Sequence, residues 1–402
     1  MAGSPSGSAA DSLAAAVAIN GIPTDQRPVR ELSTCLAQPS PLFLGHSVQE
    51  PLLEQLAREP FDTLFLISEP QVHRLHGEAL QKRLEAQFDC RFLQVASGDQ
   101  CKTFRGLEDL LEELIEQGAS KRSLLVAFGG GAVGNLVGMA AAMLFRGIPY
   151  VEIPTTMTGQ TDSVLSNKQA INGRSGKNLF GFYHAPLFIW VDSAYLLSEP
   201  LQSRRSGIVE GIKNGFISDP EFLDELATIL EPTHAYSPAQ LHTLVDRLIH
   251  SKLPILRRDP SEKRYGIVLE YGHTFGHGLE TLLHGRMIHG EAVGYGMRLA
   301  ARLAARLGLI DQELVGLHDH LIVDLLGFQA AWPAEVSAEA LLGAMATDNK
   351  KKGRDLRYVL LEAPGRCANP DGDWMMAVDP ELVLEVLRSY IADHRGPAAV
   401  PA

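Results

Sequence analysis

Cysteine and net positive charge are both scarce in this sequence. The 402 residues include four cysteines, Cys35, Cys90, Cys101 and Cys367, without the density or paired spacing of a disulfide framework or a cysteine zinc site. This pattern predicts a protein of the reducing cytoplasm. Lysine and arginine total 36 against 48 aspartates and glutamates, and the net charge of −12 argues against a nucleic-acid partner. An anionic substrate would therefore need a local cluster of basic side chains.

Long apolar runs are also missing, which argues against a membrane span. The segment 2–16 is rich in Ala, Ser and Gly, but it has no basic start and its apolar stretch is short and broken, unlike a signal sequence. We expect flexible tails over 1–25 and 395–402 and no membrane partner.

The remaining chain is longer than one hydrophobic core usually supports, so two domains are expected. In the first half, apolar strands at 63–67 and 124–128 alternate with a helical pattern at 107–116, as in a parallel sheet. Later amphipathic stretches at 237–253, 290–307 and 314–325 predict helices, with strand-like residues only near 357–361. We predict an α/β domain over 26–202 and a mostly α-helical domain over 203–394.

A glycine turn follows the predicted strand at 124–128. Gly129, Gly130 and Gly131 precede a small-residue helix, where glycines would let backbone N–H groups approach a pyrophosphate. The pattern is not GxGxxG, and such a turn is often only a tight connection, so both readings stay open. Glu69, after the first strand, could bind ribose hydroxyls, and the segment from Ser97 to Lys102 adds Asp99.

Three histidines lie within seventeen positions, each beside a glycine. His273 and His277 are four residues apart and would share a helix face, with His289 further along. Thr274 stands where an HExxH peptidase has its catalytic glutamate, which disfavours a protease. A single histidine is more often a core residue than a ligand, but this grouping favours a metal site. Glu210 with His273 and His289 would suit zinc and leave a position open for substrate oxygens, with His277 left for proton or phosphate contacts.

With these motifs, the chain from about 61 to 361 resembles the dehydroquinate-synthase-like sugar phosphate cyclases. The matching segments are 129–135, 145–148, 154–156, 162–168, 176–179, 210–213, 272–277 and 289–291. Segments 162–166, 168–170, 181–183 and 269–273 are most similar to the branch that converts D-glucose 6-phosphate into a carbocycle for aminoglycoside antibiotics. The resemblance implies a Rossmann-like NAD-binding domain followed by a helical metal-binding domain.

The resemblance also implies a role for each site residue. The NAD site would comprise Glu69, Asp99, Lys102, Gly130, Gly131, Asn135, Thr155 and Thr156. One divalent cation, zinc or cobalt, would bind Glu210, His273 and His289. The catalytic residues would be Asp162, Lys168, Lys213, Glu270 and His277, and the substrate-binding residues Arg146, Lys177, Asn178, Lys252 and Lys350. Arg146 would reach the phosphate across a homodimer interface.

Two positions depart from the dehydroquinate synthase pattern and bear on the substrate. The family's carboxylate-binding Arg aligns with Gly266 and its Asn with Glu270. Arg264 lies only two positions before Gly266, so a local shift of the alignment would restore an Arg there. A carboxylate at about 4 Å from Glu270 would cost on the order of 4 kcal/mol at an effective dielectric near 20. Glu270 instead suits the hydroxyl groups of a neutral sugar, which favours D-glucose 6-phosphate as substrate.

The resemblance implies a reaction that begins with oxidation at C4 of the sugar, which makes the C5 proton acidic enough for phosphate to leave C6. Reduction at C4, ring opening and attack of C6 on C1 would then close the carbocycle. Three alternatives remain: a cyclase for sedoheptulose 7-phosphate or the dehydroquinate precursor, a metal-dependent polyol dehydrogenase, and a non-catalytic NAD-binding protein.

Overall fold

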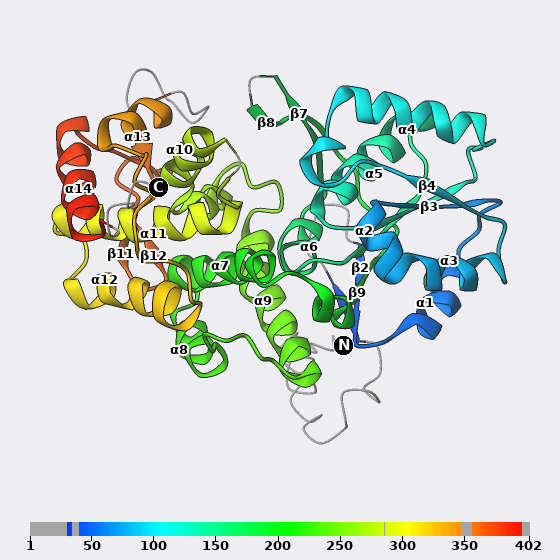
Figure 1. Cartoon of the computed structure of the whole chain (residues 1–402), viewed down its shortest axis with the longest axis horizontal. Helices are drawn as coiled ribbons and strands as arrows, with labels where there is room; N and C mark the ends of the chain where they lie inside the picture. The colour runs from blue at the N-terminus through cyan, green and yellow to red at the C-terminus, as the bar shows by residue number, and fades with distance from the viewer. Residues whose placement is uncertain (1–29, 34–39, 175, 285, 347–355, 396–402) are drawn as a thin grey trace, which may run out of the picture.

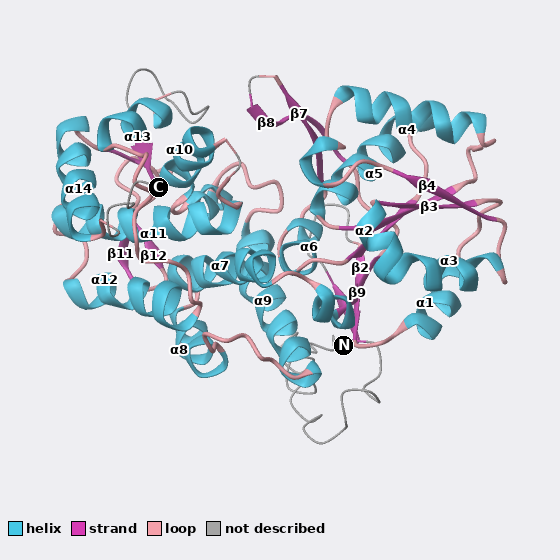
Figure 2. Ribbon diagram, in the orientation of Figure 1, coloured by secondary structure: helices cyan, strands magenta, loops and turns pink. Residues whose placement is uncertain are grey.

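The structure is a computed structural model that describes residues 30–33, 40–174, 176–284, 286–346 and 356–395. Two halves lie side by side, one built around a sheet and the other almost entirely of helices (Figure 1). Most strands of the molecule are in the first half (Figure 2). The predicted fold class is therefore confirmed.

The first half is organised by a seven-stranded sheet in the order β1-β2-β9-β6-β5-β3-β4. Neighbouring strands run parallel except β1 and β2, which are antiparallel. The strands are β1 (Arg30–Ser33), β2 (Pro41–Gly45), β3 (Leu64–Ser68), β4 (Cys90–Gln94), β5 (Leu124–Gly129), β6 (Tyr150–Pro154) and β9 (Ile189–Asp192). The two strands expected from the sequence are β3 and β5, which pair directly. Their carboxyl ends meet at one edge, where parallel sheets bind ligands.

Helices cover both faces of this sheet because the side chains of β3 and β5 alternate. Phe65 and Leu125 pack against α4 and α5, whereas Leu64 and Leu124 pack against α1 and α3. The helices of this half are α1 (Gln49–Leu56), α2 (Pro70–Val72), α3 (Glu78–Glu85), α4 (Phe104–Glu116), α5 (Gly131–Met143) and α6 (Met157–Thr161). The helix predicted at 107–116 lies within α4.

An antiparallel hairpin of β7 (Lys168–Gly173) and β8 (Gly176–Tyr183) projects from the first half toward the second (Figure 1). β7 packs on α5, and Lys168 is its first residue. Four large side chains of β8 are exposed, namely Leu179, Phe180, Phe182 and Tyr183. The hairpin therefore carries polar residues of the predicted site and an apolar surface together.

The second half contains α7 (Leu201–Ser218), α8 (Pro220–Ile229), α9 (Pro238–Arg258), α10 (His273–Leu283), α11 (His289–Arg306), α12 (Gln312–Asp319), α13 (Ala338–Met345) and α14 (Pro380–Asp393). Its short strands are β10 (Arg357–Tyr358), β11 (Leu361–Ala363), β12 (Arg366–Cys367) and β13 (Met376–Ala377). Short 3₁₀ or π turns occur in both halves. They are η3 (His73–Gly77), η4 (Gly98–Gln100), η5 (Leu144–Arg146), η6 (Ser163–Leu165) and η7 (Ser193–Ser198) in the first half, and η8 (Tyr265–Glu270) and η9 (His320–Leu325) in the second. The helices expected at 237–253 and 290–307 are α9 and α11, and the pattern at 314–325 covers most of α12 and the π turn η9.

One of the three buried hydrophobic clusters extends across both halves. Leu42 and Ile189 of the sheet belong to the same buried cluster as Ile212 of α7 and Leu248 of α9. The domain division predicted between 202 and 203 stays a prediction, and α7 spans that position. The predicted N-terminal tail lies outside the described residues, as does the C-terminal tail except Arg395, which pairs with Trp332.

In the described part of the chain, every helix is too short or too polar to traverse a lipid bilayer.

Candidate active site

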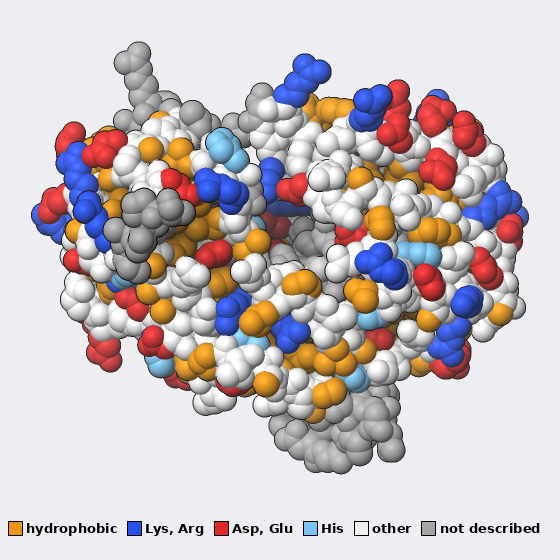
Figure 3. Space-filling model, viewed as in Figure 1, with side chains coloured by type: hydrophobic (Ala, Val, Ile, Leu, Met, Phe, Trp, Pro, Cys, Tyr) orange, Lys and Arg blue, Asp and Glu red, His pale blue; other side chains and the backbone are white. Residues whose placement is uncertain are grey.

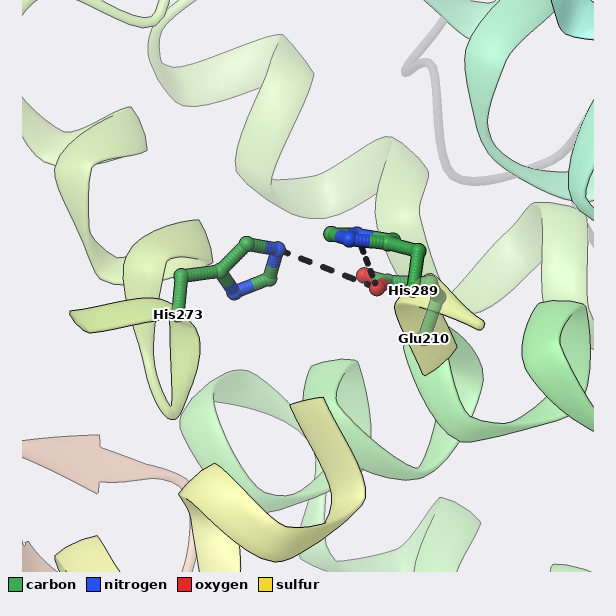
Figure 4. A group of neighbouring side chains, drawn as sticks. All are labelled: Glu210, His273 and His289. Atoms are coloured by element: carbon green, nitrogen blue, oxygen red, sulfur yellow. Dashed lines mark ion pairs between the residues drawn. The ribbon is translucent and has the colours of Figure 1, made fainter. Parts of the chain in front are cut away.

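Three helices bring a carboxylate and two imidazoles together in the helical half. Glu210 lies on α7, and His273 and His289 are the first residues of α10 and α11. Glu210 Oε1 lies 3.8 Å from His273 Nε2 and 3.5 Å from His289 Nε2 (Figure 4). This oxygen is buried and has no hydrogen-bond partner among the described residues. A buried acceptor facing two ring nitrogens fits a divalent cation such as zinc or cobalt.

Glycines allow these helices to approach closely. α10 begins directly after Gly272, whose φ of +79° lies in the left-handed region. A Cβ on Gly290 would lie 2.3 Å from Ser206 Cα, so α11 packs directly against α7. A Cβ on Gly276 would lie 3.2 Å from the backbone of Ala292, at the contact of α10 with α11. The glycines beside the histidines thus place the ligands.

The charge balance of the cluster favours an ionised Glu210. Burial opposes the charge, but an ion pair with Lys213, together with His273 and His289, lowers the pKa of Glu210 well below its ordinary value. Burial and then Lys213 hold the pKa of His273 well below that of a free histidine. A neutral imidazole is the form that binds a metal.

His289 holds its proton more tightly. Burial disfavours the charged ring, but the carboxylates of Glu210 and Glu280 raise the pKa of His289 to about 10. A cation at this site would therefore displace that proton.

His277 lies beside the two other histidines. The centroid of its ring is 5.4 Å from that of His273 and 6.1 Å from that of His289, so all three histidines predicted to act here are adjacent.

The predicted nucleotide residues gather at the carboxyl edge of the sheet. Gly130 is the N-cap of α5 and Gly131 is its first residue, and Cβ atoms there would lie 3.3 Å from Thr156 Cγ2 and 3.0 Å from Ser163 Oγ. Thr155 Oγ1 is buried with no hydrogen-bond partner among the described residues. A narrow backbone cradle beside an unsatisfied hydroxyl fits a dinucleotide.

Thr156 and Asn135 make structural contacts in this cradle. Thr156 Oγ1 accepts from Gly159 N at 3.1 Å and caps α6. Asn135 donates to Gly131 O at 2.8 Å and accepts from Ala170 N at 2.8 Å. Asn135 therefore ties the first turn of α5 to β7.

The loops after β3 and β4 bring the other predicted nucleotide residues to the same edge. Glu69 Oε2 accepts from Gly98 N at 3.2 Å. Lys102 Nζ donates to Asn178 Oδ1 at 2.5 Å, and burial is the main cause of the lowered pKa of Lys102. Asn178 belongs to β8, so the hairpin contacts this edge.

Lysine–carboxylate pairs join the sheet side to the helical side. Lys252 Nζ of α9 lies 2.8 Å from Asp162 Oδ1, which follows α6. Burial opposes the charge of Lys252, but Asp162, Glu262 and Glu210 together raise its pKa. Lys168 Nζ lies 2.7 Å from Glu262 Oε2. The molecular surface is hollowed between the two halves, with charged side chains around the opening (Figure 3).

Three further predicted site residues are Glu270, Arg146 and Lys350. Glu270 ends η8, and its negative charge partly offsets the lowering of the pKa of His273. Arg146 is exposed at the end of η5 with a φ of +70°. Lys350 lies outside the described residues. The roles of all these residues remain predictions, although the structure pairs the described lysines Lys168, Lys213 and Lys252 with carboxylates where the two halves meet.

Sequence reasoning missed two acidic residues of this cleft, Glu262 and Glu280. Glu262 pairs with Lys168, and Glu280 Oε2 lies 3.1 Å from His289 Nδ1. The spacing could have revealed Glu280, because it lies three positions after His277 and seven after His273 on one helix. Glu262 lies in an irregular loop with no periodic pattern.

Gly266 and Arg264 have structural roles in that loop. Asp259 Oδ2 accepts from Arg264 N at 2.7 Å and from Gly266 N at 2.9 Å. A Cβ on Gly266 would lie 2.7 Å from Glu262 Cβ. A larger residue at 266 would therefore displace Glu262.

Comparisons with known proteins identify the family of this chain. Residues 92–206 match the family model of the 3-dehydroquinate synthase N-terminal domain, and residues 207–351 match that of the C-terminal domain. A 2-deoxy-scyllo-inosose synthase of Streptomyces kanamyceticus is 35% identical over 365 residues, 89% of this chain and 93% of the relative. One of Niallia circulans is 33% identical over 349 residues, 86% of this chain and 95% of the relative.

A crystal structure of 2-deoxy-scyllo-inosose synthase complexed with carbaglucose-6-phosphate, NAD+ and Co2+ is also similar to this chain. The TM-score is 0.83 at 32% identity, covering 90% of this chain and 99% of the other. The chain therefore belongs to the family of the 2-deoxy-scyllo-inosose synthases and matches both the N-terminal and the C-terminal 3-dehydroquinate synthase family models.

Proposed function

We propose that this protein is a carbon–oxygen lyase that converts D-glucose 6-phosphate into 2-deoxy-scyllo-inosose, with release of phosphate, for aminoglycoside antibiotic biosynthesis. One observation carries the proposal: Glu210 Oε1, which is buried and has no hydrogen-bond partner among the described residues, faces the ring nitrogens of His273 and His289. The relatives named 2-deoxy-scyllo-inosose synthase and the solved structure with a glucose 6-phosphate analogue support the choice of substrate.

The chemistry divides between cofactors and side chains. When bound, NAD would take up and return a hydride at C4, and a divalent cation would polarise the oxygen there. The phosphate that leaves C6 would be held by Lys168, Lys177, Asn178 and Lys350. Lys213 and His277 would move protons near the cation, because Lys213 already pairs with Glu210 and His277 lies beside both histidine ligands.

Glu270 would select the sugar. Its negative charge would repel the carboxylate of the dehydroquinate precursor. Its carboxylate oxygens would accept hydrogen bonds from sugar hydroxyls. It would also move a proton when the ring opens. A hexose phosphate whose sugar end carries no carboxylate therefore suits this cleft better than a carboxylated one.

The proposal includes a homodimer that works in the cytoplasm. The hairpin exposes Phe180 with 45% and Phe182 with 51% of their surface accessible, and Phe104 packs on Phe180 with ring centroids 4.9 Å apart. A second copy would cover this apolar surface and bring its Arg146 to the phosphate. Light scattering at micromolar concentration should give the mass of two chains, and a monomer that retains full turnover would reject this part.

A substrate panel tests the function. The protein with NAD and Co2+ is given D-glucose 6-phosphate, sedoheptulose 7-phosphate or the dehydroquinate precursor, and phosphate release is followed. We expect release from glucose 6-phosphate with no lasting absorbance of NADH. Release from another sugar instead would favour the other cyclases, and stoichiometric NADH would favour a polyol dehydrogenase. Turnover that survives complete chelation would reject the cation site.

A further inference from the structure

The strongest unassigned feature of the cleft is Glu280 on α10. Its Oε2 lies 3.1 Å from His289 Nδ1, and its Oε1 lies 3.2 Å from Lys177 Nζ. The side chain is 12% exposed. The two oxygens of one partly buried carboxylate thus have separate partners on two sides of the cleft.

The contact with His289 decides which ring nitrogen can face a cation. A neutral imidazole has one N–H and one lone pair. With the hydrogen on Nδ1 and donated to Glu280, the Nε2 lone pair points toward Glu210 Oε1, 3.5 Å away. Carboxylates behind metal-binding histidines fix the ring in this way and strengthen the ligand. His273 has a weaker counterpart, because its Nδ1 lies 3.2 Å from the backbone oxygen of Tyr271.

The contact with Lys177 links the two halves. Lys177 lies on β8 of the sheet half, and its Nζ is also 3.1 Å from Asp99 Oδ2. Asp99 and Glu280 together raise the pKa of Lys177 against the effect of burial. Glu280 therefore connects a histidine of the helical half to a lysine of the hairpin.

We propose that Glu280 is a positioning residue that orients His289 toward the cation and holds Lys177 at the cleft. The proposal rests on the proposed function in that a divalent cation binds Glu210, His273 and His289. The alternative is a second cation bound by His277, Glu280 and His289, whose ligand atoms lie within 4.8 Å of one another. A second cation would compete with the hydrogen bond that His289 Nδ1 already donates to Glu280 Oε2. This contact favours the positioning role of Glu280 over a second cation site.

Cobalt binding tests the first half without any substrate. Visible absorption and competition with a chelator give the Co2+ affinity and stoichiometry of the wild type, Glu280→Ala and Glu280→Gln. We expect Glu280→Ala to bind Co2+ about 10- to 100-fold more weakly, as for other carboxylates behind a metal-bound histidine. Glu280→Gln should lose less, because its amide oxygen still accepts from Nδ1. The matched control is Glu339→Gln, which removes an exposed glutamate paired with Arg388 and should bind Co2+ as the wild type does.

Each outcome of this titration decides a different point. Equal Co2+ affinity in Glu280→Ala and Glu339→Gln would overturn the orienting role while leaving the proposed function intact. Two tightly bound cobalt ions per wild-type chain would favour the second cation site. A wild type that binds no Co2+ would reject the proposed function and this inference together.

Steady-state kinetics at saturating Co2+ test the second half. Glu280→Gln should raise KM for D-glucose 6-phosphate about tenfold and lower kcat less, because Lys177 loses a charged partner that positions it for the phosphate. Glu339→Gln should leave both constants unchanged. An unchanged KM in Glu280→Gln would show that Lys177 does not depend on Glu280.

Discussion

Lys168 and Glu262 form an ion pair of 2.7 Å that joins the first residue of β7 to the loop between α9 and α10. Glu262 is only 13% exposed, and its Oε1 has no hydrogen-bond partner among the described residues. The pair sets the position of a predicted catalytic lysine from the opposite side of the cleft.

Glu262→Gln should lower kcat/KM for D-glucose 6-phosphate about 10- to 100-fold, since misplacing a reacting group by about 1 Å can cost that much. Steady-state kinetics measure the effect. Glu225→Gln, which breaks the more exposed pair with Arg247, is the control and should be near wild type. Equal kinetics in the two variants would contradict a positioning role for Glu262.

Glu270→Gln removes the charge and keeps the shape of a residue near the cation site. We expect kcat with D-glucose 6-phosphate to fall about 100-fold or more, within the range found for lost proton-transfer groups. Unchanged turnover would rule out a role for this charge. The same variant should also bind a carboxylated sugar phosphate more tightly, because the repulsion is gone, and inhibition constants check this.

Gly290→Ala should separate α11 from α7, because the added Cβ would lie 2.3 Å from Ser206 Cα. We expect a loss of about 1–3 kcal/mol in the free energy of unfolding, as for other overpacked sites, and weaker Co2+ binding through misplaced His289. Gly316→Ala on α12 is the matched control, since nothing lies within 4 Å of its added Cβ. That control should be neutral or up to about 1 kcal/mol more stable. Normal cobalt binding by Gly290→Ala would contradict the packing argument.

His318 should make the stability of the fold depend on pH. Burial lowers its pKa from 6.5 to about 4, while its Nδ1 bonds Leu314 O at 2.7 Å and its Nε2 lies 2.8 Å from the Tyr271 hydroxyl. Between these two pKa values the unfolded chain binds a proton that the folded chain does not. The free energy of unfolding is therefore unaffected by this proton above pH 6.5. It falls as the pH decreases from 6.5 toward 4, by roughly 3 kcal/mol in total.

Urea unfolding at several pH values measures this dependence. His318→Gln should be less stable at pH 7.5 but should lose less further stability on acidification than the wild type. The comparison of slopes isolates His318 from other buried histidines, such as His234, whose pKa burial also lowers. Identical slopes would contradict the assignment.

The order of elements and the candidate metal ligands could be predicted from the sequence, because local patterns indicate them, whereas the roles of the site residues stay predictions. Alternation at 63–67 and 124–128 and helical periodicity at 237–253 and 290–307 reflect which side chains are buried. The histidine–glycine segments around His273 and His289 pointed to a ligand set, since few other side chains bind a divalent cation so readily.

Only the tertiary structure decided which charges meet. Glu262 and Glu280 are ordinary acidic residues in the sequence, and their partners Lys168, His289 and Lys177 come from other elements. Ion pairs between distant segments leave no periodic pattern, because they depend on how helices pack rather than on local propensity. The close contact of Gly290 with Ser206 brings α11 and α7 together and so places His289 beside Glu210. The sequence determined which groups are available, and packing determined which of them act together.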